Sequence, residues 1–183
     1  DCQPFIQMTK ALTKHHVSVP KIYHQELSRG FLLLSDFGDQ LLLNQLDNDT
    51  ANQYYHQAMD ILINIHHCKC HQEYTPFHSD PTYWQKELEG FITWYVEYRH
   101  QYVLSSSDRS VWENLQEIIT SNITQQPQVL THKDFHSRNL MCLTDNTLGV
   151  LDYQDALFGP ITYDIASLLN DCYIDWPRGQ IEQ

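Results

Sequence analysis

The sequence predicts an α+β fold, because a short β-hairpin is followed by a long helical region and then by a second group of short strands. Two short extended runs, 21–27 and 31–34, flank a turn that contains Gly30, which is the pattern of a hairpin. Helical periodicity then dominates for about a hundred residues. Beyond Pro127, three apolar runs again have the length of strands: 129–131, 140–143 and 148–151.

Helical periodicity is found both before the hairpin and after it. From Pro4 to His15 apolar residues recur at helical spacing, and the pattern ends at 17–20. After the hairpin, four apolar residues share one helical face: Ala58, Ile61, Leu62 and Ile65. A last helix is predicted to begin near Thr162 or Tyr163.

Two aspartates are predicted to cap further helices. Asp80 precedes a proline at the first helical position, which is a typical helix start. The aromatic residues that follow lie on or near an apolar stripe, so we expect Trp84, Trp94 and Tyr95 to lie in the core. Asp108 is predicted to cap a third helix with an apolar face: Val111, Leu115, Ile118 and Ile119.

Composition narrows the class of protein. With 42% apolar and 19% charged residues, the chain of 183 residues has the composition of a globular protein. A formal net charge of −12 disfavours nucleic-acid and anionic-membrane partners, although a nucleotide can still bind with magnesium. The five cysteines are odd in number, and neither a leader nor a long apolar span is found, so we expect a cytoplasmic protein.

The octet HKDFHSRN, His132 to Asn139, has the H-x-D-x-x-x-x-N pattern of kinase catalytic loops, and Asp152 follows a predicted hairpin. Phosphoryl transfer needs a carboxylate that orients the attacking hydroxyl, and oxygen ligands for magnesium. We therefore predict Asp134 as the general base and Asn139 with Asp152 as magnesium ligands. His132 is expected to be structural, packing beneath the loop and bonding to nearby backbone. His136 either lines a phosphate pocket or is an ordinary loop histidine.

These residues resemble the aminoglycoside phosphotransferase family, whose members carry a similar H-G-D-F-H-P-G-N loop followed by an I-D-x-x-x-A segment. HKDFHSRNLM and GVLDYQDALFGPITYDIASLLNDCYIDWP are most similar to one branch, the bacterial kinases that phosphorylate N-acetylmuramate and N-acetylglucosamine at C1. The resemblance implies an ATP- and Mg²⁺-dependent small-molecule kinase with an amino-sugar substrate. Lys133, Ser137 and Arg138 depart from the commonest family loop.

The resemblance also implies a protein-kinase-like, two-lobed fold. Residues 1–37 would be the remainder of the small lobe and the hinge, and 38–183 a large, mostly helical lobe. Asp36 and Phe37 would meet the adenine of ATP at the hinge, and Asp164 would support the catalytic loop from the following helix. The family's phosphate-covering loop and strand lysine have no counterpart here, so we expect a piece of a longer protein.

Several alternatives stay open. Aminoglycoside and choline-type kinases share the catalytic loop, and a catalytically silent binding module is a further possibility. Asp155 is either a metal or substrate ligand or a solvated acid. A cluster of His and Cys invites a zinc site, but consecutive helix residues point in different directions and there is no C-x-x-C pair: His66, His67, Cys68, Cys70 and His71. The oligomeric state is not predicted.

Overall fold

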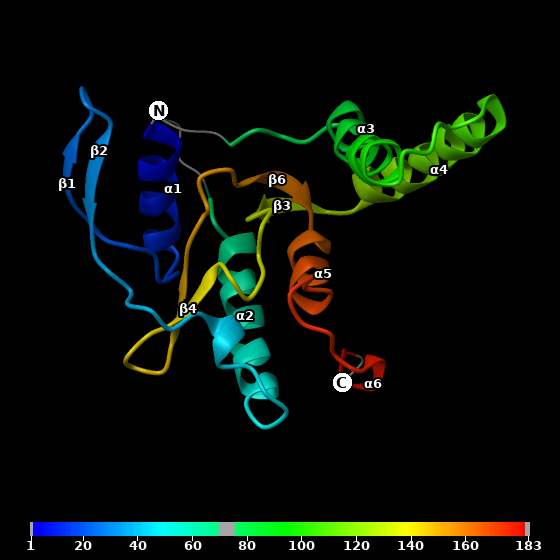
Figure 1. Cartoon of the computed structure of the whole chain (residues 1–183). Helices are drawn as coiled ribbons and strands as arrows, with labels where there is room; N and C mark the ends of the chain where they lie inside the picture. Colours follow the sequence, from blue (N-terminus) through cyan, green and yellow to red (C-terminus); the bar gives the residue numbers. More distant parts are fainter. Residues whose placement is uncertain (1, 70–75, 182–183) are drawn as a thin grey trace.

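The computed structural model describes residues 2–69 and 76–181, which form helices around short antiparallel strand pairs (Figure 1). The helices are α1 (Gln3–Lys14), η1 (Leu42–Asn44), α2 (Ala51–His66), α3 (Pro81–Gly90), η2 (Phe91–Arg99), α4 (Ser106–Gln125), α5 (Tyr163–Leu169) and α6 (Arg178–Ile181). The strands are β1 (Ile22–Glu26), β2 (Phe31–Leu34), β3 (Gln128–Thr131), β4 (Leu140–Cys142), β5 (Leu148–Val150) and β6 (Leu157–Pro160). They pair as β1–β2, β3–β6 and β4–β5.

The N-terminal part has the predicted helix and hairpin. Pro4 lies in the first turn of α1, where a missing N–H costs nothing, and α1 buries one apolar side that includes Met8 and Leu12. The turn between β1 and β2 contains Gly30 with a φ of +72°, a conformation that suits glycine. Figure 1 shows α1 beside this hairpin at one edge of the molecule.

The core lies between α1, α2 and the strands that flank the predicted catalytic loop. α2 buries Ala58, Leu62 and Ile65, in agreement with the predicted helical face. Phe135 and Tyr153 are the largest fully buried side chains, and both lie within the segments predicted to carry the site. The core is therefore built directly beneath the residues of interest.

The caps of α3 and α4 partly follow the predictions. The carboxylate of Asp80 accepts a hydrogen bond from the backbone N–H of Tyr83 at 2.8 Å, which confirms it as the cap of α3. For α4 the prediction was wrong, because Ser105 is the N-cap. Asp108 is the third helical residue, and its carboxylate accepts from the Ser105 backbone N–H at 3.1 Å in a capping box. The sequence pattern permitted both positions, since either residue type can cap.

The aromatic stripe after α3 is only partly buried. Trp84 is buried as predicted, at 2% exposure, but Trp94 and Tyr95 are 67% and 55% exposed, so their assignment to the core was wrong. The helix changes at Phe91 into the π-helix η2, whose wider turn alters the direction of successive side chains. The predicted apolar face of α4 is also exposed at Val111 and Ile118. Periodicity identifies an apolar face but not what covers it.

Candidate functional site

The segment 132–139 crosses from β3 to β4 and carries the predicted catalytic residues. Phe135, near its middle, is fully buried and anchors the segment in the core. Asp134 is exposed next to it. Two backbone hydrogen bonds tighten the loop, from the N–H of His136 to the carbonyl of Asp134 at 3.1 Å and from the N–H of Asn139 to the carbonyl of His136 at 2.9 Å. The Asp134 carboxylate is thus presented to solvent from a fixed backbone.

The ring of His132 lies under this loop and joins it to the segment after β5. The backbone N–H of Asp134 donates to Nδ1 of His132 at 3.3 Å, and Nε2 donates to the carbonyl of Leu151 at 2.8 Å. Burial lowers the pKa of His132 to about 4, so the ring is neutral at pH 7. The carboxylates of Asp134 and Asp152 both oppose this lowering, so both lie within electrostatic range of the ring.

Asn139 is oriented by the loop itself. Its Nδ2 donates to the backbone carbonyl of Asp134 at 2.9 Å, and the side-chain oxygen Oδ1 takes no part in this hydrogen bond. The carbonyl of Asn139 accepts from the N–H of Leu151 at 2.9 Å, so the residue before Asp152 is paired with Asn139. These bonds place the backbones of Asp134, Asn139 and Leu151, the residue before Asp152, next to one another.

Asp152 is exposed at the far side of the β4–β5 hairpin. Its φ of +61° is in the left-handed region, which an aspartate adopts at some energetic cost. The amide Nε2 of Gln154 donates to Oδ1 of Asp152 at 2.7 Å and so orients the carboxylate. The strained backbone and this hydrogen bond together aim the carboxylate.

Asp164 holds the beginning of the loop from below. It is fully buried on α5, and its two carboxylate oxygens accept the backbone N–H groups of His132 at 2.7 Å and Lys133 at 3.0 Å. Burial raises the pKa of Asp164 to about 7, although the two N–H donors act in the opposite direction. The side chain is placed where a supporting role would require it.

Asp171 holds the other end of the loop, and the sequence reading missed it. This buried carboxylate accepts the backbone N–H of Ser137 at 2.8 Å and that of Tyr173 at 2.9 Å. The Tyr173 ring meets the ring of His136 edge-on at 5.3 Å, and the Arg138 guanidinium lies 4.8 Å from its centre. Its one signal in the sequence is that an aspartate follows shortly after the helix predicted to begin near Thr162 or Tyr163, which by itself is not specific.

The predicted hinge residues, Asp36 and Phe37, line a cavity of about 450 Å³ together with the turn between β4 and β5. The carboxylate of Asp36 accepts the N–H of Gly38 at 2.8 Å, and Gly38 has a φ of +79°. The Phe37 ring packs on β5, so that a Cβ added to Gly149 would lie 2.5 Å from Cε2 of Phe37. Phe37 thereby packs the predicted hinge segment against the hairpin that precedes Asp152.

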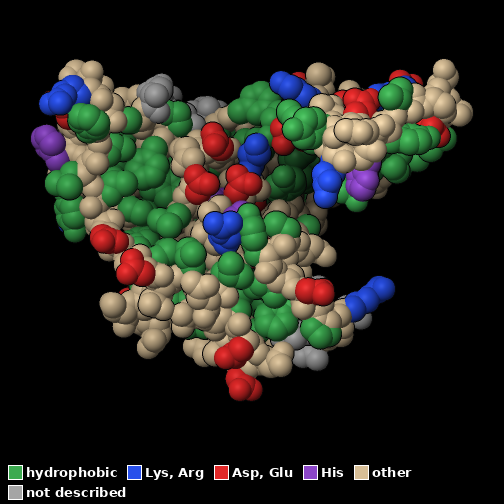
Figure 2. Space-filling view, in the orientation of Figure 1, with side chains coloured by type: hydrophobic (Ala, Val, Ile, Leu, Met, Phe, Trp, Pro, Cys, Tyr) green, Lys and Arg blue, Asp and Glu red, His purple; other side chains and the backbone are tan. Residues whose placement is uncertain are grey.

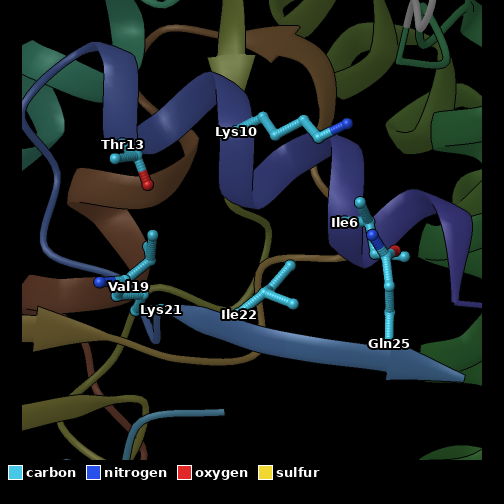
Figure 3. A pocket seen from close by; sticks show the side chains of 7 residues that line it. All are labelled: Ile6, Lys10, Thr13, Val19, Lys21, Ile22 and Gln25. Carbon is cyan, nitrogen blue, oxygen red and sulfur yellow. The ribbon is translucent and has the colours of Figure 1, made fainter. Parts of the chain in front are cut away.

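A further cavity of about 440 Å³ lies between α1 and β1 (Figure 3). The residues that line it are Ile6, Lys10, Thr13, Val19, Lys21, Ile22 and Gln25. None of the predicted site residues is among them. Figure 2 shows instead that acidic side chains gather near the middle of the face seen in Figure 1, with basic side chains beside them.

Within 2–69 and 76–181, no helix is both long and apolar enough to cross a bilayer.

The histidine and cysteine cluster does not form a metal site in the described part of the chain, where no three such ligands or carboxylates meet. His66 and His67 lie at the end of α2, and Nδ1 of His67 is 2.7 Å from the carbonyl of Ile63. Cys68 is buried. Cys70 and His71, which also belong to the predicted cluster, lie outside the described residues.

The donor set at 139 and 152 fits magnesium. An amide oxygen and a carboxylate are hard ligands, and protein Mg²⁺ sites commonly use one or two carboxylates together with water and substrate phosphates. Both side chains are oriented by hydrogen bonds that leave ligand oxygens unused, Oδ1 of Asn139 and Oδ2 of Asp152. The residues present are therefore compatible with this ion.

Comparison with known proteins gives matches along the whole chain. The model of the "Phosphotransferase enzyme family" matches residues 1–183. Two similar proteins, each named N-acetylmuramate/N-acetylglucosamine kinase, come from Pseudomonas putida and Pseudomonas aeruginosa, at 35% identity over 182 residues and 34% over 181. The matches cover 100% and 99% of this chain but 53% of each relative. The chain thus spans about half the length of the curated relatives it matches.

Solved structures agree on the fold. The ADP-bound aminoglycoside phosphotransferase APH(2'')-Ib has a TM-score of 0.68 at 17% identity, with 94% of this chain and 61% of that chain covered. A choline kinase from Streptococcus pneumoniae has a TM-score of 0.67 at 14% identity, with 100% and 59% covered. The predicted protein-kinase-like α+β fold is confirmed, and the chain contains part of it. The division into lobes at residue 37 stays a prediction.

Proposed function

Because the chain belongs to the phosphotransferase enzyme family, we propose that the protein transfers the γ-phosphoryl group of ATP to a sugar hydroxyl. The acceptor in this proposal is the C1 hydroxyl of N-acetylmuramate or N-acetylglucosamine, the sugars in the names of relatives that match the whole chain. The observation that carries the proposal is the mutual fixing of Asp134, Asn139 and the segment before Asp152.

In this proposal Asp134 is the general base. Its exposed carboxylate accepts a hydrogen bond from the acceptor hydroxyl and takes the proton onto a carboxylate oxygen as the bond to phosphorus forms. The neutral ring of His132 and the carboxylate of Asp164 keep the loop backbone in place. They act through Asp134 and do not touch the reacting atoms.

Asn139 and Asp152 would hold Mg²⁺ through their side-chain oxygens. The bound ion would neutralise the developing charge on the phosphate oxygens. Gln154 orients Asp152 through a 2.7 Å hydrogen bond and so fixes one side of this pair. Asp36 and Phe37 would bind the nucleotide at the hinge cavity, where Phe37 is held against Gly149.

The test is an assay of the complete gene product with Mg-ATP and each of three acceptors: N-acetylmuramate, N-acetylglucosamine and kanamycin. We expect ADP release and a phosphate at C1 of the amino sugars, detected by phosphorus NMR of the product. Chelation of the metal should stop the reaction. Phosphorylation of kanamycin with neither amino sugar accepted would refute the proposed acceptor, and absence of ADP release with all three would refute the proposed activity.

A further inference from the structure

A cavity of about 300 Å³ lies next to the proposed base and has no role in the mechanism above. Tyr83, Lys133, Gln154 and Asp155 are among the residues that line it. Lys133 directly precedes Asp134 in the chain, and Gln154 holds the carboxylate of Asp152. A molecule in this cavity would therefore lie near both Asp134 and Asp152. The part of the acceptor that is away from the reacting hydroxyl has to be bound in such a place.

Lys133 is fixed at its backbone and at the end of its side chain. Its φ of +79° is in the left-handed region, and its N–H donates to the buried Asp164 at 3.0 Å. At the other end, Nζ lies 5.5 Å from the centre of the Tyr83 ring, within the range of a cation–π contact. An ammonium group held in this way loses little conformational freedom when it binds a ligand.

The ammonium group keeps its charge. Burial acts to lower the pKa of Lys133, but the Tyr83 hydroxyl and the negative charge of Glu87 outweigh it, and the pKa is raised. Both ion pairs found between described residues belong to Arg109, so Lys133 has no direct carboxylate partner among 2–69 and 76–181. A half-buried cation without an ion-pair partner can form a charge-assisted hydrogen bond with an anionic group of a ligand.

The remaining lining suits a polar, ring-shaped ligand. Gln154 and Asp155 provide an amide and a carboxylate that can bond to hydroxyl and N-acetyl groups, and the Tyr83 ring provides a flat apolar face. Of the two amino sugars named above, N-acetylmuramate carries a lactyl carboxylate on the ring and N-acetylglucosamine has none. On the basis of the proposed function, we propose that Lys133 binds this carboxylate and makes the acidic amino sugar the preferred acceptor.

The test compares acceptors with and without the lactyl carboxylate charge, using the complete gene product and Mg-ATP. kcat/KM is measured for N-acetylmuramate, its uncharged methyl ester and N-acetylglucosamine, in the wild type and in Lys133→Met. We expect Lys133→Met to lower kcat/KM for N-acetylmuramate about 10- to 100-fold more than for the ester, which is typical for loss of a charged hydrogen bond. Lys133→Arg should keep most of the preference for the acid.

Lys21 provides the matched control, because its Nζ also lies 5.5 Å from a tyrosine ring, that of Tyr23, and it does not line this cavity. Lys21→Met should keep the wild-type ratio of acid to ester. Urea unfolding of each variant tests the fold, and Lys133→Gln replaces the Met variant if that protein does not fold. An acid-to-ester ratio unchanged by loss of the Lys133 charge would overturn the inference and leave the proposed function standing. A wild type that phosphorylates neither amino sugar would overturn both.

Discussion

The hydroxyl groups of Thr9 and Tyr153 lie 2.8 Å apart in the core and join α1 to the residue that follows Asp152. Thr9 donates its own proton to the carbonyl of Phe5 at 2.7 Å, so Tyr153 is the donor to Thr9. The Phe5 ring also stacks on the Tyr153 ring, with 5.0 Å between their centres. The proposed magnesium ligand is thus next to a residue that is fixed to α1.

Loss of the acceptor, the Thr9 hydroxyl, should destabilise the protein more than loss of the donor, the Tyr153 hydroxyl. Burial raises the pKa of Tyr153 to about 12, so its phenol keeps the proton and needs an acceptor. In Thr9→Val the buried hydroxyl of Tyr153 loses its acceptor, and we expect the free energy of unfolding to fall by about 1–3 kcal/mol. Tyr153→Phe should lose only about 0.5–1.5 kcal/mol. Urea unfolding at neutral pH measures both, and the reverse order would contradict the assignment of Tyr153 as donor.

Asp134→Asn should remove the proposed base without disturbing the loop, because the backbone groups of Asp134 make its loop contacts. We expect kcat to fall about 100- to 10,000-fold, the usual contribution of a general base. Mg-ATP affinity, measured by calorimetry, should be retained. Asp60→Asn, which removes an exposed carboxylate on α2, is the control and should keep full activity. Near-normal kcat in Asp134→Asn would exclude this residue as the base.

Gly149→Ala should disturb the hinge, because the new Cβ would lie 2.5 Å from Cε2 of Phe37 and 3.2 Å from a methyl carbon of Leu143. We expect overpacking to cost about 1–3 kcal/mol of stability and nucleotide affinity to fall as Phe37 moves. Gly90→Ala is the control, since the nearest atom to its Cβ is 3.9 Å away and alanine favours helix. Urea unfolding and Mg-ATP calorimetry measure both effects. Equal nucleotide affinity in the two variants would argue against the hinge assignment.

Asp164 should make stability depend on pH. Its pKa is raised to about 7 in the folded protein, whereas an unfolded aspartate titrates near about 3.9. Between these values the folded state binds the proton more tightly, so the contribution of Asp164 to the free energy of unfolding falls as pH rises from about 4 to 7. Urea unfolding across this window should show a smaller decline for Asp164→Asn than for the wild type. Identical pH dependence in the two proteins would contradict the raised pKa.

Local rules predicted much of the fold. The first helix, the hairpin around Gly30 and the Asp80 cap follow from patterns within a few residues, and the structure has all three. The loop octet and Asp152 were identified because spacing within a motif is visible in sequence, and in the structure the backbone of Asn139 pairs with that of Leu151, next to Asp152. Their chemical roles stay predictions until turnover is measured.

Features set by distant neighbours were not predictable in the same way. Asp171 binds the N–H of Ser137 across 34 residues, and nothing near it in the sequence indicates that contact. Trp94 and Tyr95 follow an apolar periodicity, yet their exposure depends on the π-helical turn of η2 and on how much of it is covered. Ser105 and Asp108 cap one helix jointly, so the choice between them required the backbone geometry.

The two carboxylates that hold the loop from below are seven residues apart, Asp164 on α5 and Asp171 just after it. The loop is thus attached at two points to α5 and to the residues just after it, so we expect a tilt of this helix to move His132 and Ser137 together. Because Asp134 lies between these two attachment points, we expect a displacement of α5 to change the position of its carboxylate.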